Sequence, residues 1–258
     1  MPRALSRRAL LLASTALAGI ASEPHIGEGR TISGEVPWSP GTADAPSLFA
    51  QGELKFFTRE EAAFMDAVLA RLIPADDLGP GAREAGVTVF LDRQLAGSYG
   101  RGDTWYMDGP WHDGSKSQGY QSHLTPAQLY RAAIKSIDAH CREKYSGKAF
   151  RELSTDQQDA VLTDLEKGHL KLQGVGEHSL GVEGTKGDTF FATLLQNTAE
   201  GFFCDPIYGG NRDMIGWKLI GFPGARYDYR PYVKRHGEKI DLAPVGILGR
   251  PDWHSDNS

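Results

Sequence analysis

Helix-capping signals followed by apolar residues at helical spacing recur through the middle of this chain, and they limit its fold more than any other feature. Thr58 and Glu61 form a capping box, in which each side chain satisfies the backbone amide of the other residue. Apolar residues then share one helical face until Pro74 ends the pattern. The apolar positions of this predicted helix are Met65, Val68, Leu69, Leu72 and Ile73.

The same signals predict four further helices. We expect one over Ala82–Leu95, one that opens at Thr125–Gln128 with Pro126 in its first turn, and one that opens at Ser154–Gln157. Asp188 is predicted to cap a strongly apolar helix that reaches Phe202. The inward positions of the four are Val87, Phe90, Leu91 and Leu95; Leu129, Ala133, Ile137 and Cys141; Val161, Leu162 and Leu165; and Phe190, Phe191, Leu194, Leu195 and Phe202.

Strands are not indicated by the pattern. Alternation of apolar and polar residues is nearly absent, so a substantial sheet is not expected. Tyr99–Tyr120 is rich in Gly and fits neither period, and we predict a long ordered loop there. The sequence therefore predicts a mainly α fold, an irregular bundle of about five or six helices.

The first 21 residues have the pattern of an export signal. Arg3, Arg7 and Arg8 precede a short apolar run, and small residues before Ala21 suit a cleavage site. Ser6-Arg7-Arg8 resembles a twin-arginine signal, the type that exports folded proteins. An ordinary secretory signal with two chance arginines is the alternative. We predict a twin-arginine signal peptide at residues 1–21 and a periplasmic protein.

Two irregular segments flank the predicted helical domain of residues 56–222. Residues 22–55 are rich in Gly, Pro and Ser and read as an extended arm. Residues 223–258 form a long irregular C-terminal tail, in which Tyr, Trp and Arg alternate with Gly and Pro. Tyr, Trp and Arg dominate binding hot spots, so the region from Tyr208 to Tyr232 is a candidate partner interface; packing onto the bundle is the alternative. The candidate interface residues are Tyr208, Arg212, Trp217, Phe222, Arg226, Tyr227, Tyr229 and Tyr232.

Composition and motif searches exclude several classes of function. The formal net charge of -5 argues against nucleic acid as a partner. Two cysteines, Cys141 and Cys204, are too few for a four-thiolate zinc site and too far apart in the sequence for a C-x-x-C motif; they could pair with each other, bind a partner chain or remain thiols. The sequence shows no nucleotide-binding glycine motif and no nucleophile elbow, and we assign no catalytic, cofactor-binding or metal-binding residue.

Two stretches resemble the gluconate 2-dehydrogenase subunit 3 (gamma chain) family. The first runs from Phe56-Phe57-Thr58 through Glu61-Ala62 to Arg71-Leu72-Ile73-Pro74-Ala75-Asp76. The second, which is longer and more specific, is Glu200-Gly201-Phe202-Phe203-Cys204-Asp205-Pro206-Ile207-Tyr208-Gly209-Gly210-Asn211-Arg212-Asp213, followed by Gly216-Trp217-Lys218-Leu219-Ile220-Gly221-Phe222-Pro223-Gly224. The resemblance covers about Phe56 to Tyr232.

The resemblance implies a non-catalytic small subunit of a dehydrogenase complex. Such subunits accompany an FAD-carrying catalytic subunit of the glucose-methanol-choline type and a multi-haem cytochrome c subunit. The complex oxidises a sugar, sugar acid or polyol in the periplasm, associates with the membrane, and passes electrons to quinone. A signal for the twin-arginine translocase on a chain without a cofactor motif is explained if the flavin subunit is exported bound to it.

Two other classes of function remain open at this point. One is a free-standing periplasmic protein that binds a metal or another ligand. The other is an enzyme with an unfamiliar site that uses His112, Asp113 or Asp205.

Overall fold

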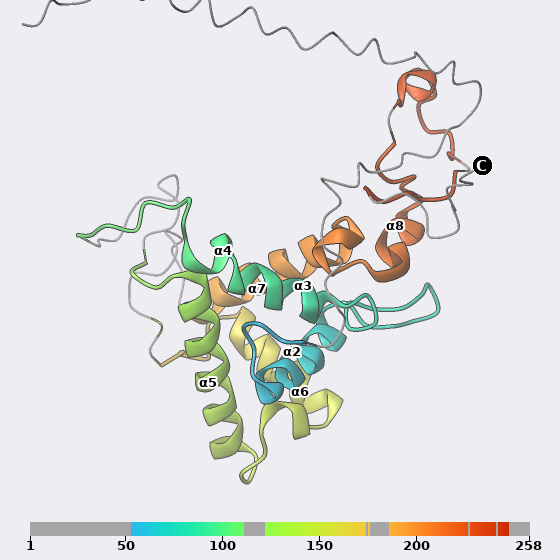
Figure 1. Cartoon of the computed structure of the whole chain (residues 1–258). Helices are drawn as coiled ribbons and strands as arrows, with labels where there is room; N and C mark the ends of the chain where they lie inside the picture. The colour runs from blue at the N-terminus through green and yellow to red at the C-terminus, as the bar shows by residue number, and fades with distance from the viewer. Residues whose placement is uncertain are drawn as a thin grey trace, which may run out of the picture. The chain divides into compact units, whose positions relative to one another are not determined.

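The computed structural model describes residues 53–110, 122–173, 175, 186–226, 228–240 and 242–247. These residues form seven α-helices and, apart from two isolated bridges, no β-structure, so the mainly α prediction is confirmed for this part of the chain. The helices are α2 (Arg59–Leu72), α3 (Val87–Ala96), α4 (Ser98–Arg101), α5 (Pro126–Lys144), α6 (Thr155–Glu166), α7 (Lys186–Phe203) and α8 (Ile215–Ile220). Figure 1 shows α8 at the end of α7, and the two helices are in contact. The predicted signal peptide, the arm as far as residue 52 and the tail beyond residue 247 lie outside the described residues.

Capping boxes start three of the helices, as the sequence predicts. Thr58 and Glu61 cap α2, Thr125 and Gln128 cap α5, and Ser154 and Gln157 cap α6, each through two reciprocal hydrogen bonds. The backbone amides of the three N-cap residues donate to the side-chain oxygens at distances of 2.8, 2.8 and 3.1 Å. Local sequence therefore fixes the beginning of each of these helices.

The structure corrects three predicted boundaries. The helix predicted from Ala82 begins only at Val87, because residues 82–86 form turns that bury Ala82 and Ala85, and Gly86 has a left-handed φ of 76° that no helix accommodates. Asp188 is not a cap, because α7 already begins at Lys186. The loop predicted from Tyr99 begins with the short helix α4.

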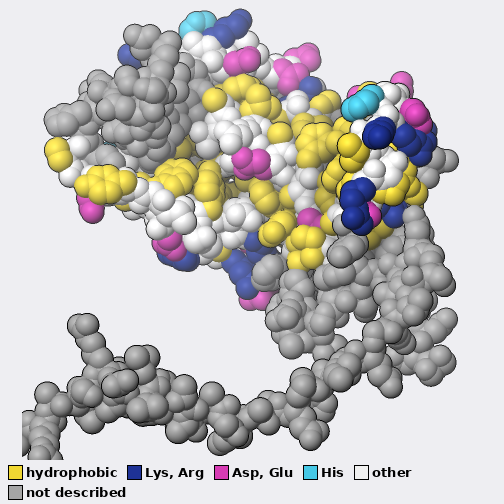
Figure 2. Space-filling model, turned by 90° about the horizontal axis from the view of Figure 1, so that it is seen from above, with side chains coloured by type: hydrophobic (Ala, Val, Ile, Leu, Met, Phe, Trp, Pro, Cys, Tyr) yellow, Lys and Arg dark blue, Asp and Glu magenta, His cyan; other side chains and the backbone are white. Residues whose placement is uncertain are grey.

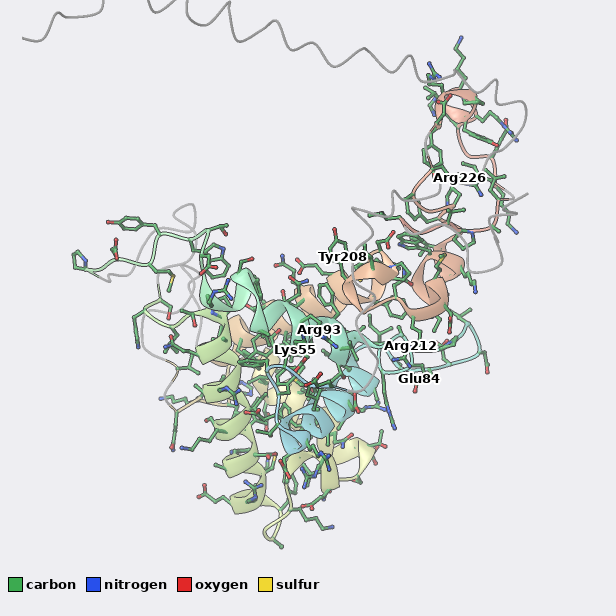
Figure 3. The ribbon with its side chains drawn as sticks, viewed as in Figure 1. Lys55, Glu84, Arg93, Tyr208, Arg212 and Arg226 are labelled. Atoms are coloured by element: carbon green, nitrogen blue, oxygen red, sulfur yellow. The ribbon has the colours of Figure 1, made fainter. Side chains whose placement is uncertain are left out.

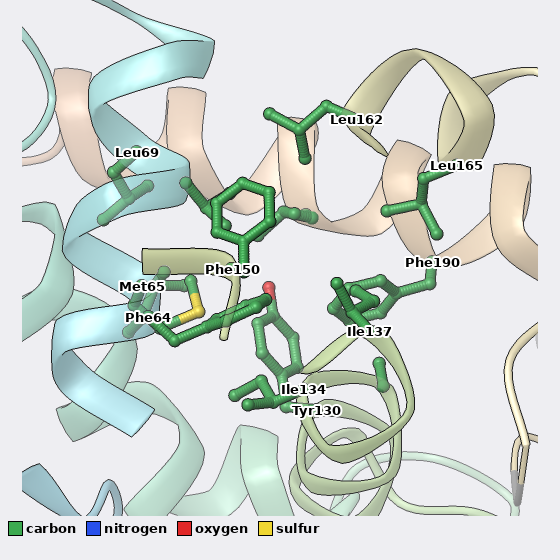
Figure 4. Close-up of a cluster of buried hydrophobic side chains, with 14 of the residues drawn as sticks. Phe64, Met65, Leu69, Tyr130, Ile134, Ile137, Phe150, Leu162, Leu165 and Phe190 are labelled. Atoms are coloured by element: carbon green, nitrogen blue, oxygen red, sulfur yellow. The ribbon is translucent and has the colours of Figure 1, made fainter. Parts of the chain in front are cut away.

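One hydrophobic core joins the helices. Figure 4 shows side chains from α2, α5, α6 and α7 meeting around Phe150 of a short 3-10 turn, η1 (Phe150–Glu152). Nearly all the predicted inward positions are buried, including the apolar stripes of α5 and α6. Three predicted positions, Leu72, Ile73 and Phe191, are only half-buried, and Leu195 of α7 is exposed over 43% of its surface. At the edge of this core, the Arg71 guanidinium of α2 binds Asp159 of α6 through two hydrogen bonds of 2.6 and 2.8 Å.

A buried carboxylate ties the beginning of the described chain to this core. Asp92 of α3 is 1% exposed and accepts hydrogen bonds from the backbone amides of Lys55, Phe56 and Phe57 at 2.8 to 2.9 Å. The guanidinium of Arg131 on α5 donates to the Phe56 carbonyl at 2.6 Å and lies 4.3 Å from the centre of the Phe56 ring. The chain therefore enters the helical domain at a fixed point between α3 and α5.

Asp92→Ala should destabilise the protein by about 3 kcal/mol or more, because three amides lose a charged acceptor. Urea unfolding followed by circular dichroism measures this change. Asp103→Ala is the control: Asp103 pairs with Arg101 at the surface, and its loss should cost less than about 1 kcal/mol. Equal unfolding midpoints for the two variants would contradict the role given to Asp92.

Candidate functional site

The longer sequence motif, residues 200–224, forms a tight connection at the end of α7. Gly201 of α7 faces Phe90 of α3 so closely that a Cβ atom there would lie 2.6 Å from the Phe90 ring. The chain then turns back, and a Cβ atom on Gly210 would lie 2.1 Å from the Gly201 carbonyl oxygen. A side chain on Gly210 would separate two segments that are in backbone contact, and a side chain on Gly201 would have to displace the side chains of Phe90 and Val87, so both positions favour glycine.

Asn211 holds this turn together. Its side chain is fully buried; Nδ2 donates to the Cys204 carbonyl and Oδ1 accepts from the Gly216 amide, both at 2.8 Å. The backbone of Asn211, Asp213 and Met214 is left-handed, with φ of 44°, 54° and 56°. Such conformations cost non-glycine residues roughly 1–2 kcal/mol each, so the two hydrogen bonds of Asn211 compensate for local strain.

Trp217 of α8 packs inside the chain, as the packing alternative expects. It is 5% exposed, and its indole Nε1 donates to the Phe203 carbonyl at 2.7 Å. The Phe222 ring stands edge-on to the indole, with ring centroids 5.1 Å apart. Trp217 therefore anchors α8 to the end of α7, and Phe222, which is 41% exposed, extends that contact to the surface.

Asp205 also has a structural role in this connection. One carboxylate oxygen accepts from the Ile207 amide at 3.0 Å and caps the 3-10 turn η2 (Pro206–Tyr208), and the other accepts from the Ile247 amide at 2.7 Å. The other candidates for an unfamiliar catalytic site, His112 and Asp113, lie outside the described residues. Within the described part of the chain, no group of three or more His, Cys, Asp or Glu is placed to hold a metal ion.

The other candidate interface residues divide between surface and interior. Figure 3 shows Tyr208 and Arg212 near the end of α7 and Arg226 farther along the chain. Tyr208 is 50% exposed. The half-buried Arg212 donates its backbone amide to the Ala85 carbonyl at 2.9 Å, and its guanidinium lies over Gly86. Its guanidinium forms no ion pair with Asp205 or Asp213, the two carboxylates nearest to it in the sequence.

Arg226, Tyr229 and Tyr232 are half-buried in the loop that follows α8. Arg226 donates to the Ala243 carbonyl at 2.7 Å, and the Tyr229 hydroxyl donates to the Gly224 carbonyl. The Tyr232 ring lies beneath the guanidinium of Arg235. Tyr227 lies outside the described residues.

Both cysteines are free thiols in the structure. Cys141 is buried on the inner face of α5, and Cys204 is half-buried at the end of α7, where its thiol donates to the Gly201 carbonyl. Burial disfavours the thiolate and raises the pKa of each cysteine to about 12. Neither has the lowered pKa of a reactive cysteine.

Exposed hydrophobic side chains gather at this connection. Among the described residues, ten large hydrophobic side chains are exposed, and five of them lie between residues 203 and 222. We call these five the junction surface: Phe203, Tyr208, Leu219, Ile220 and Phe222. Figure 2 shows hydrophobic side chains on the face seen from above. An exposed apolar concentration of this kind is typical of a protein-binding surface.

A family model for gluconate 2-dehydrogenase subunit 3 matches residues 59–224, more than half of the chain. The chain belongs to the gluconate 2-dehydrogenase subunit 3 family. The match spans α2 to the residues just after α8, so the helices that form the core and the residues of the junction surface lie within the matched region. No curated protein and no solved structure matches the chain.

Membership in this family places the chain among the small subunits of dehydrogenase complexes. No helix of the described residues has the length and apolar character needed to cross a membrane. The sequence predicts a candidate interface in this region, but Leu219 and Ile220 are not among the predicted interface residues. For Leu219 the available signal was the pattern of α8: in a helix that buries Trp217, the residue two positions later lies on nearly the opposite face.

Asn211→Ala should destabilise the protein by about 2–4 kcal/mol, because it leaves a buried amide and a buried carbonyl without partners. Thermal melting of the purified variant measures this effect. Lys218→Ala is the control, since Lys218 is exposed on α8 and its loss should change stability by less than about 0.5 kcal/mol. A melting temperature for Asn211→Ala equal to that of the control would show that Asn211 does not hold the connection.

Proposed function

We propose that this chain is a non-catalytic subunit of a gluconate 2-dehydrogenase-like complex and that it binds the catalytic subunit through the junction surface. The family match carries the proposal, because it assigns the chain to a subunit rather than to a free-standing enzyme. In this proposal the catalytic subunit is of the glucose-methanol-choline type and carries FAD. It oxidises a sugar, sugar acid or polyol and passes electrons to a cytochrome c subunit and quinone.

The exposure of the junction surface supports this role. Ile220 is 59% exposed, Tyr208 50% and Leu219 46%, so these side chains have apolar area available for burial against a partner. Burying apolar area is the main favourable contribution to association. Five of the ten large exposed hydrophobic side chains of the described residues fall between residues 203 and 222, and exposed apolar patches mark protein-binding sites.

The residues beneath the surface keep it rigid. Trp217 and Asn211 hold α8 against the end of α7 by hydrogen bonds to the Phe203 carbonyl, the Cys204 carbonyl and the Gly216 amide. A surface held in one conformation loses less entropy on binding than a mobile one. In this proposal Tyr208, Arg212 and Phe222 contact the partner directly, whereas Trp217 positions α8 from behind.

The proposal includes export of the two subunits together. Arg7 and Arg8 supply the twin-arginine pair, and the translocase accepts folded cargo, so one signal can carry a preassembled pair to the periplasm. The complex would then associate with the membrane through its cytochrome subunit. Folding and stability of the catalytic subunit would depend on the small subunit, since a partner that binds only the folded form stabilises it.

Replacing Leu219 and Ile220 together by Ser should weaken binding of the catalytic subunit without lowering the melting temperature. Truncating buried interface anchors typically costs about 2 kcal/mol or more, which corresponds to an affinity loss of about 30-fold. The measurement is co-purification of flavin absorbance with the tagged chain, expressed together with its neighbouring genes.

The matched control replaces Leu78 and Leu195 by Ser. Both are exposed leucines outside the junction surface, at 78% and 43%, so the chemical change is similar but the location differs. If both double variants recover as much flavin as the natural chain, the junction surface is not the docking site. If the natural chain itself recovers no flavoprotein, the proposed function is wrong.

Replacing Arg7 and Arg8 by Lys should leave both this chain and the flavoprotein in the cytoplasm, because the translocase recognises the arginine pair. Dehydrogenase activity in periplasmic and cytoplasmic fractions measures the outcome. Arg3→Lys serves as the control, since Arg3 lies outside the pair. Active flavoprotein in the periplasm of the double variant would contradict shared export.

A further inference from the structure

Residues 223–247, which we call the C-terminal loop, begin and end at the connection between α7 and α8. The Ala225 amide donates to the Val245 carbonyl at 2.6 Å, and the Val245 amide donates to the Pro223 carbonyl at 3.2 Å. The Ile247 amide binds Asp205 at the end of α7. These bonds close the loop at its base, next to Phe222 of the junction surface.

Bonds within the loop also fix its interior. Arg226 donates across the loop to the Ala243 carbonyl, and Tyr229 donates to the Gly224 carbonyl. A short 3-10 helix, η4 (Arg230–Tyr232), follows Tyr229 in the loop. Residues 233–239 that follow η4 are exposed, and Val233 has 64% of its surface exposed.

The loop differs in charge from the remainder of the chain. Residues 223–247 contain five Lys or Arg and three Asp or Glu, a formal net charge of +2. The whole chain carries -5, so all other residues together carry -7. Positive charge is therefore concentrated in the segment that follows the junction surface, on a chain that is otherwise acidic.

Two exposed lysines of the loop have no carboxylate partner among the described residues. Asp228 is bound by Arg230 at 2.8 Å, which lowers the pKa of Asp228, and Glu238 is bound by Arg235 at 2.7 Å. Lys234 and Lys239 are exposed and form no ion pair with any other described residue. Figure 2 shows dark-blue Lys and Arg side chains gathered among hydrophobic ones at one end of the molecule.

We propose that the C-terminal loop binds an acidic area of the same catalytic subunit that covers the junction surface, with Lys234 and Lys239 as the principal contacts. This inference rests on the proposed function. Because the loop is closed at its base beside Phe222, a partner that covers the junction surface comes close to the loop as well. Complementary charge there would speed association and fix the orientation of the two subunits.

An anionic membrane is a weaker match for this loop. Segments that bind acidic lipids typically carry a cluster of about four to eight Lys or Arg, whereas this loop has two lysines without a carboxylate partner among the described residues. Among the loop's described residues before Ile247, Val233 is the one large hydrophobic side chain that is strongly exposed, which gives little apolar area for insertion into lipid.

The test reverses the charge of Lys234 and Lys239 by replacing both with Glu. The probe is the flavoprotein that co-purifies with the natural full-length chain, and its affinity for each variant is measured at about 50 mM and about 500 mM salt, where screening is weak and strong. The double variant should bind about tenfold more weakly at low salt and nearly as well as the natural chain at high salt. Replacing both lysines by Gln removes their charge without reversing it, so the logarithm of the affinity at low salt should change by about half as much.

The matched control replaces Lys148 and Lys171 by Glu, since these exposed lysines lie on the helical domain and the change in total charge is the same. It should alter the affinity at low salt less than about twofold. Circular dichroism melting of each variant confirms that all are folded.

The outcomes separate this inference from the proposed function. If the natural chain captures flavoprotein and the Lys234/Lys239 variant binds it equally at both salt concentrations, the loop inference is overturned and the proposed function stands. If no flavoprotein is captured, both are overturned. If the natural chain, but not the variant, binds vesicles of phosphatidylglycerol and phosphatidylcholine while flavoprotein affinity is unchanged, the loop binds lipid and the inference is wrong.

Discussion

Where α7 ends, the chain turns back so tightly that Gly210 lies directly against the Gly201 carbonyl. This contact places Asn211 beneath the turn, where its amide group binds one backbone group on each side. Trp217 then reaches the Phe203 carbonyl, and Asp205 reaches the Ile247 amide. Helix α8, the junction surface and the base of the C-terminal loop all depend on this backbone contact.

The polar residues of the motif are used mainly to build the connection rather than to perform chemistry. Asn211 and Asp205 are both occupied by backbone groups, and the thiol of Cys204 is kept protonated by burial, with its pKa raised to about 12. What the motif presents outward is largely apolar: Phe203, Leu219 and Ile220. A connection that is rigid inside and apolar outside suits a subunit whose role is to bind another protein.

The two halves of the proposed interface use different physical forces. The junction surface offers apolar area, whose burial is insensitive to moderate salt, whereas the loop offers positive charge, whose attraction salt screens. The Asp92 carboxylate lies apart from this interface and has a different role. It fixes the point where residues 55–57 enter the helical domain.

The sequence by itself determined the helices that begin with a capping box, their buried faces and the family. Thr58, Thr125 and Ser154 act on residues three positions away, so such signals are local and can be read directly. The sequence could not show that the helix predicted from Ala82 begins only at Val87. Nor could it show that the Trp217 side chain is buried within the chain rather than exposed. These outcomes depend on contacts between residues far apart in the chain, such as Gly201 with Phe90 and Asp92 with Lys55. Only the tertiary structure decided which aromatic and apolar residues of the motif are covered, because coverage depends on which other segments pack against them.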